Sequence, residues 1–103
     1  MLLPQNQKIS FTGDEVLDIF REIELILTSL HCMGSHYPQG GAEYERETTR
    51  FIDEWKVCAR LARVRGILGE KFDSTLGSDD MDDLERAVQD LPYWESMSSI
   101  APE

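Results

Sequence analysis

The sequence holds few side chains suited to catalysis, and two cysteines and two histidines stand out among them. Cys32 or Cys58 beside His31 or His36 would supply a thiolate nucleophile and its general base, and the four together have the ligand types of a zinc site. No nucleophile motif surrounds either cysteine, and the spacing of the four residues is irregular. Cysteines on apolar stripes are usually inert, so we expect Cys58 to be buried and Cys32 to be the more exposed thiol. The sequence therefore predicts a protein without enzymatic activity.

The acidic residues do not form a known metal motif either. Neither histidine has a glutamate three residues before it, as the di-iron sites of helical bundles need. The cluster Asp79-Asp80-Met81-Asp82-Asp83 lacks the spacing, central glycine and closing glutamate of a calcium-binding EF-hand loop. The glycines before the second half of the chain lack the ending of a phosphate-binding loop. We predict no metal and no cofactor.

Charge is the most specific feature of the sequence. The 103 residues contain 20 Asp and Glu against 10 Lys and Arg, a net charge of −10. Residues 73–103 hold nine acids and one base, a net charge of −8. Such a segment is either a solvated face that suits a helix N-terminus or an electrostatic docking surface for a basic partner. Two aromatic residues follow it and serve either as interface anchors or as a cover for a helix end. The predicted partner-binding residues are Asp79, Asp80, Asp82, Asp83, Tyr93 and Trp94.

These features favour a non-enzymatic, acidic protein-binding module that neutralises or regulates a partner protein with a basic surface. Immunity proteins, antitoxins and phage-encoded inhibitors resemble the chain in size and charge, although no motif here identifies such a family. A pI of about 4.5 argues against direct binding to nucleic acid or to an anionic membrane. The alternative function is a self-associating helical scaffold or accessory subunit that forms a homodimer.

Helices must position these residues, because no alternating strand pattern occurs in the sequence. Residues 1–11 are predicted to be an extended lead-in. Thr12 and Glu15 have the spacing of a capping box, which predicts a helix over 13–32. Its apolar residues recur at steps of four and three, in a stripe broad enough for burial on more than one side. The stripe consists of Val16, Phe20, Ile23, Leu27 and Leu30, and it is widened by Leu17, Ile19, Leu25 and Ile26.

A second helix is predicted over 42–70, with its acids early and its bases late, as the helix dipole favours. A third, acidic helix is predicted over 79–91, before Pro92. Three bases of the second helix share a face, and we expect them to pair with the acidic third helix; they are Lys56, Arg60 and Arg63. The short loop after the first helix favours an antiparallel hairpin. The predicted fold class is therefore all-α, a two-helix hairpin plus a shorter acidic third helix in a small bundle.

Chain length and cysteine content predict the domain organisation and the compartment. The length fits a single domain, 1–103, that ends in an aromatic and polar tail over 92–103. The first residues lack the basic and apolar regions of a signal peptide, and no apolar run approaches the ~20 residues that span a bilayer. The hairpin holds the two cysteines roughly 20 Å apart, so they do not form a disulfide framework. We expect a reduced, cytoplasmic protein.

Overall fold

The computed structural model describes residues 2–96, and all secondary structure in this range is helical. The all-α class predicted from the sequence is confirmed. Residues 97–103 of the predicted tail lie outside the described residues. The chain divides into two compact units, which are described one at a time. We call Lys8–Phe72 the hairpin unit, and Met1–Gln7 together with Asp73–Glu103 the acidic unit.

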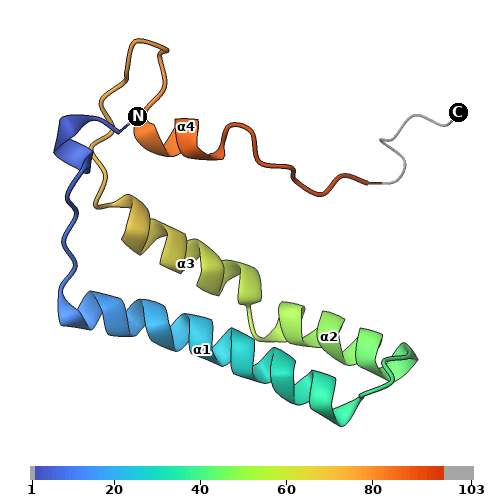
Figure 1. Ribbon diagram of the computed structural model, residues 1–103. Helices are drawn as coiled ribbons and strands as arrows, with labels where there is room; N and C mark the ends of the chain where they lie inside the picture. Colours follow the sequence, from blue (N-terminus) through green and yellow to red (C-terminus); the bar gives the residue numbers. More distant parts are fainter. Residues whose placement is uncertain (1, 97–103) are drawn as a thin grey trace, which may run out of the picture. The chain divides into compact units, whose positions relative to one another are not determined.

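The hairpin unit consists of α1 (Gly13–His36), α2 (Ala42–Glu54) and α3 (Val57–Gly69). Figure 1 shows α1 lying antiparallel to α2 and α3, so the predicted helical hairpin is confirmed. The predicted capping box starts α1, since the Glu15 amide donates to the Thr12 hydroxyl and the Thr12 amide donates to the Glu15 carboxylate. The helix runs four residues beyond its predicted end. In the turn after α1, Gly40 and Gly41 have positive φ angles of 69° and 102°, which glycine adopts readily.

The single helix predicted over 42–70 is wrong, because the chain breaks between α2 and α3. Lys56 has φ 55° and ψ 45°, a left-handed conformation that an α-helix cannot contain. Six residues at 100° each would place Phe51 and Val57 about 120° apart around an unbroken helix. The break resets the phase, and both side chains are buried, at 7% and 8% exposure. The Arg60 guanidinium donates to the Trp55 carbonyl at 2.8 Å, which satisfies a backbone group that the break leaves open.

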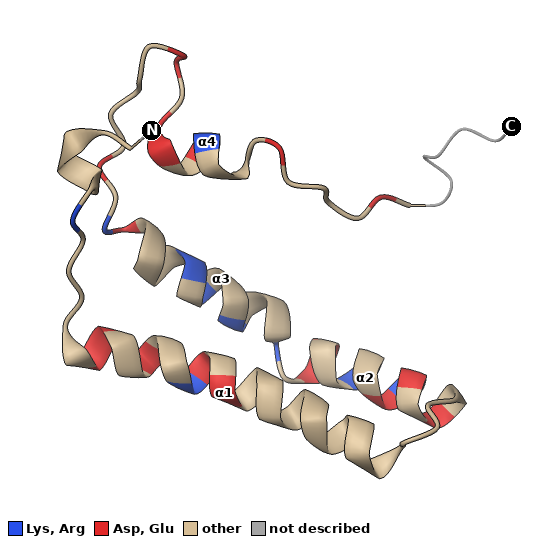
Figure 2. Ribbon diagram, in the orientation of Figure 1, with Lys and Arg blue, Asp and Glu red and all other residues tan. Residues whose placement is uncertain are grey.

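Ion pairs join α1 to the other arm of the hairpin. Figure 2 shows acids in the first half of α1 and bases along α3. The pairs follow the antiparallel order of the two arms: Glu22 with Arg60 at 3.3 Å, Asp18 with Arg63 at 3.3 Å, and Glu15 with Lys71 at 2.7 Å. Two of these bases were expected to pair with the acidic third helix, and that expectation is wrong. The pairs occupy the face of α1 that meets α3, and no residue of α1 is buried.

The acidic unit contains the short 3-10 helix η1 (Pro4–Asn6) and α4 (Asp83–Val88). The lead-in predicted as extended is therefore partly helical, and Asn6 at its end is 2% exposed. α4 is shorter than the predicted helix over 79–91. It starts at a capping box, in which the Asp82 carboxylate accepts from the Glu85 amide at 2.8 Å. The residues before it form a turn instead, because Asp80 adopts a left-handed φ of 61°.

Candidate functional site

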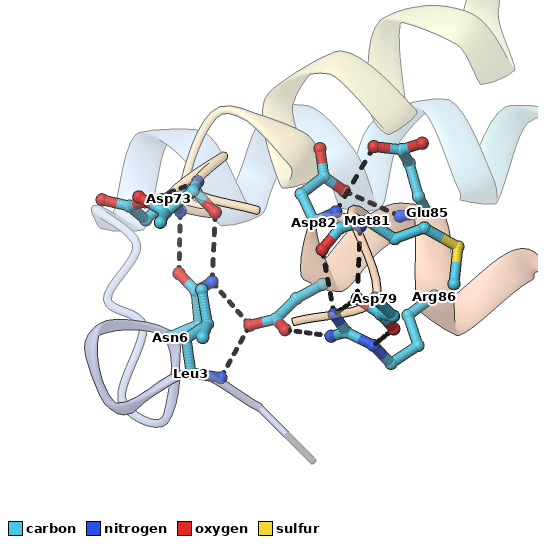
Figure 3. A network of polar contacts seen from close by, with 10 residues as sticks. Leu3, Asn6, Asp73, Asp79, Met81, Asp82, Glu85 and Arg86 are labelled. Carbon is cyan, nitrogen blue, oxygen red and sulfur yellow. Dashed lines mark hydrogen bonds and ion pairs between the residues drawn. The ribbon is translucent and has the colours of Figure 1, made fainter. Parts of the chain in front are cut away.

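A buried carboxylate, Asp83, holds the acidic unit together through its partners Leu3, Asn6 and Arg86, which are labelled in Figure 3. The residue is 3% exposed. Its side chain accepts from the Leu3 amide at 2.9 Å and from the Asn6 side-chain amide at 2.7 Å. The Arg86 guanidinium, one helical turn away, donates to the other carboxylate oxygen at 2.6 Å. A charge this deeply buried is stable only when it is paired and fully hydrogen-bonded, and here both conditions are met. Asp83 thus fixes the start of the chain against α4.

Arg86 extends this network into the turn before α4. Its Nε and Nη2 atoms donate to the two carboxylate oxygens of Asp79, both at 2.7 Å. Nη2 also donates to the Met81 carbonyl at 2.9 Å. Gly77 leaves the space for this guanidinium, since a Cβ there would lie 2.7 Å from Nη2. One arginine therefore uses its planar, bidentate geometry to shape the whole turn.

Asn6 links the network to the segment that enters the acidic unit. Its side chain donates to the Asp73 carbonyl at 3.2 Å and accepts from the Asp73 amide at 2.7 Å, as a backbone strand would. The Asp73 carboxylate accepts in turn from the Thr75 amide at 2.8 Å and from the Thr75 hydroxyl. The Asn6 side chain thus joins the two pieces of chain that form the unit, beside the bond from the Leu3 amide to Asp83 (Figure 3).

These contacts favour the charged forms of the groups involved. The hydrogen bond from Asn6, followed by that from the Leu3 amide, holds the pKa of Asp83 below its ordinary value. The Arg86 guanidinium lowers the pKa of Asp79, whose carboxylate raises the pKa of Arg86 in return. Hydrogen bonds from Thr75 lower the pKa of Asp73. The network is therefore ionised at neutral pH and acts as a structural element.

The six predicted partner-binding residues fall into two groups. Asp79 and Asp83 are committed to Arg86, and Asp83 is buried, so its predicted place on a binding surface is wrong. Asp80 is exposed, while Asp82 is half-buried and caps α4. The two aromatic residues are exposed, Tyr93 at 67% and Trp94 at 85%. The Tyr93 hydroxyl donates to the Val88 carbonyl at 3.4 Å. Acids and aromatic rings are thus presented around α4, by a network that buries part of the predicted site.

Sequence reasoning missed the residues that build this network. Asn6 and Asp83 are 77 positions apart, and no local pattern connects them. One feature of the sequence pointed to a role for Arg86 in pairing these acids, because it is the single base within residues 73–103. A lone base among nine acids is positioned to pair with more than one of them, as it does here.

Three of the four cysteines and histidines lie together on the surface, and Cys58 does not lie with them. Both Cys32 and Cys58 are exposed, so the expected burial of Cys58 is wrong. The reason is the break at Lys56, which turns Val57 and Val64 inward and leaves Cys58 outside. His31, Cys32 and His36 line an open surface depression together with Thr28 and Ser35. Within residues 2–96, no three His, Cys, Asp or Glu side chains are grouped so that they could hold a metal ion.

Two further observations bear on function. None of the helices in the described part of the chain has the length and apolarity needed to cross a membrane. No family model, no curated protein and no solved structure matches the chain. The function must therefore be inferred from the chain's own residues.

Proposed function

We propose that the protein is a non-enzymatic protein-binding module whose acidic unit docks on a basic surface of a partner protein and so neutralises or regulates it. One observation carries this proposal. Arg86 is the single base between residues 73 and 96, and it already pairs with Asp79 and Asp83. The remaining acids of this segment have no base within it to compensate them. A basic partner would supply the missing positive charge, and the field of these acids would speed its association.

Exposed apolar side chains beside these acids support the same function. Leu91, Tyr93 and Trp94 follow α4 and are 51%, 67% and 85% exposed. Tryptophan and tyrosine dominate the energetic centres of protein interfaces, where a polar rim surrounds them. Exposed acids, Asp90 and Glu95, flank the two rings in the sequence. The segment thus combines anchors for an apolar pocket with charges for a basic rim.

The ionised network orders the part of the acidic unit that precedes this segment. Binding costs less when the groups that make contact are already ordered. Asp83, Asn6 and Arg86 hold α4 and the turn before it through hydrogen bonds of 2.6–2.9 Å. The Tyr93 hydroxyl donates a hydrogen bond to the carbonyl of Val88, the last residue of α4. A reduced, cytoplasmic setting is part of the proposal, and it agrees with the two free cysteines.

Charge reversal within the binding segment tests the proposal. The test variant carries Asp90→Lys and Glu95→Lys, and the matched control carries Asp53→Lys and Glu70→Lys, which change net charge equally on exposed positions of the hairpin unit. Asp80 is left unchanged because its left-handed backbone would add strain to the effect. Tagged protein is used to capture partners from lysate at low and high salt, and the association rate of each captured protein is then measured.

The expected outcome is a basic partner that binds wild type and control and is lost at high salt. The association rate of the test variant should fall about tenfold or more, since steering depends on these charges. Trp94→Ala should instead raise the dissociation rate about tenfold or more. Equal association rates for the test variant and the wild type would refute the proposed docking surface.

A further inference from the structure

The hairpin unit leaves an unusual amount of apolar surface uncovered. Six large apolar side chains of α1 are between 38% and 57% exposed, and five of them form one row: Val16, Phe20, Ile23, Leu27 and Leu30. They recur at steps of four, three, four and three, the spacing of a seam between two packed helices. The seam is about 21 Å long, from its fourteen residues of rise. It carries no charged residue and lies beside the face of α1 that binds α3.

The other arm of the hairpin adds to the same face. Successive residues of an α-helix are rotated by 100° about its axis. Around α1, the seam is therefore rotated by about a third of a turn from the acids that pair with α3, in the sense in which residue numbers increase. Leu61 and Leu68 lie at a similar angle, in the same direction, from the α3 bases that receive those acids. In an antiparallel pair of helices, an equal rotation of this sense away from the contact face reaches the same side of the pair on both helices. Both leucines therefore lie on the same side of the hairpin as the seam. They are 48% and 41% exposed.

Ile52 occupies the equivalent position on α2, measured from the buried Phe51, and is 41% exposed. One side of the hairpin therefore presents exposed apolar side chains from all three helices, with the exposed Arg65 at the same spacing between Leu61 and Leu68. We call it the hairpin face, and its residues are Val16, Phe20, Ile23, Leu27, Leu30, Ile52, Leu61 and Leu68.

We propose that the hairpin face binds the same face of a second copy of the chain, so that two hairpins form a helical bundle. This inference is independent of the docking function, because it uses the other unit. About half of each of eight large side chains amounts to roughly 600 Å² per copy, near the ~800 Å² per partner of a standard interface. The exposed area of roughly 600 Å² is as large as the largest apolar patches on ordinary monomers.

Two features of the hairpin unit select a second copy as the occupant. First, the seam is nearly symmetric about Ile23, with Val16 seven residues before it and Leu30 seven residues after. A two-fold axis through Ile23 therefore sets α1 antiparallel to its copy, with Val16 of each copy against Leu30 of the other, an isologous contact.

Second, the charges of the hairpin unit permit self-association. Residues 8–72 hold 11 acids and 9 bases, a net charge of −2, whereas the rest of the chain carries the remaining −8. Several acids of α1 are already paired within the hairpin, with Arg60, Arg63 and Lys71. Two copies can therefore approach through this face without strong repulsion, and the dimer would present two acidic units to the partner.

A charge at the centre of the seam tests the dimer. Ile23→Glu places a carboxylate on the two-fold axis, and Thr28→Glu is the matched control, an exposed α1 position outside the seam. Molar mass is measured by light scattering and sedimentation from 1 to 200 μM, with helix content followed by circular dichroism.

Wild type and Thr28→Glu should reach twice the chain mass of 11.8 kDa. Ile23→Glu should remain at 11.8 kDa with unchanged helix content, because its dissociation constant should rise about 100-fold or more. A wild type that stays monomeric at 200 μM, or an Ile23→Glu variant that dimerises like wild type, would overturn the proposal.

Cross-linking tests the antiparallel arrangement in a chain with Cys32→Ser and Cys58→Ser. A short bismaleimide should link Ile23→Cys to its own copy, and should link Val16→Cys to Leu30→Cys when the two variants are mixed. Efficient linking of Val16→Cys to itself, without linking to Leu30→Cys, would overturn the two-fold arrangement.

Discussion

The two units of the chain bury opposite kinds of side chain. In the hairpin unit the buried residues are apolar, namely Phe51, Val57 and Val64. Among the described residues of the acidic unit they are polar, namely Asn6 and Asp83. An apolar core tolerates imperfect partners, whereas a buried carboxylate must have every hydrogen bond in place. The comparison teaches that one small chain can use burial for cohesion in one unit and a satisfied polar network for a defined shape in the other.

Both solutions leave surface available for binding. In the hairpin unit, ion pairs occupy the face between α1 and α3, so the apolar stripe of α1 falls on an adjoining, open face. In the acidic unit, the network uses Arg86 and two carboxylates and leaves the aromatic rings exposed. The interior of each unit therefore determines what it offers outside.

Removing the largest buried side chain should have the largest effect, confined to the hairpin unit. Phe51 is 7% exposed, and its ring lies 5.9 Å from that of Trp55. We expect Phe51→Ala to lower the free energy of unfolding of the hairpin by about 3–5 kcal/mol, because it leaves a cavity. Urea unfolding followed by Trp55 fluorescence in a Trp94→Phe background measures it. A loss below about 1 kcal/mol would show that the apolar core does not hold this unit.

Removing the bridging amide should have the next largest effect, confined to the acidic unit. Asn6→Ala removes hydrogen bonds to Asp83 and Asp73 and leaves buried groups without partners. We expect a loss of about 2–3 kcal/mol in the stability of this unit. Urea unfolding followed by amide NMR signals of residues 73–96 measures it, with the exposed neighbour change Gln7→Ala as control. Equal effects of the two substitutions would contradict the role of the network.

Lowering the pH should reduce the stability of the two units to different extents, gradually and by less than the two substitutions above. The pKa values of Asp73, Asp79 and Asp83 are lowered in the folded acidic unit, all from an ordinary value of 3.8. Groups of this kind stabilise the fold above their unfolded pKa and lose that contribution as pH falls through the folded pKa. In the hairpin unit, the hydrogen bond from Lys71 lowers the pKa of Glu15 from its ordinary value of 4.5.

We therefore expect both units to keep full stability down to about pH 5 and the acidic unit to lose more of it below the ordinary Asp value. Amide NMR spectra recorded from pH 7 to pH 2 measure how much signal each unit loses. A larger loss in the hairpin unit than in the acidic unit would contradict the assignment of the carboxylate network to the acidic unit.

Local signals in the sequence predicted the hairpin well. The capping box at Thr12 and Glu15 and the glycines after α1 act within a few residues, so the sequence alone indicated the first helix and the turn. The break at Lys56 has no such signal, since neither glycine nor proline occurs there. It follows from packing, because Phe51 and Val57 must both turn inward.

The acidic unit was predicted less well, for the same physical reason. Its net charge was evident from composition, but the helix was predicted over 79–91, whereas α4 spans Asp83–Val88 after its N-cap Asp82. The contacts of Asp83 with Leu3 and Asn6 join residues 80 and 77 positions apart. No periodicity reports such a contact, so a buried structural carboxylate could not be told from an exposed one in the same cluster.

Residue-resolved amide hydrogen exchange on wild type and Asn6→Ala tests the central claim most directly. If the two units rest on different interactions, Asn6→Ala should raise exchange rates about 30-fold or more in α4, as a loss of about 2 kcal/mol implies. The protected amides of α1 and α3 should exchange at wild-type rates. A uniform increase across both units, or no increase in α4, would contradict the account.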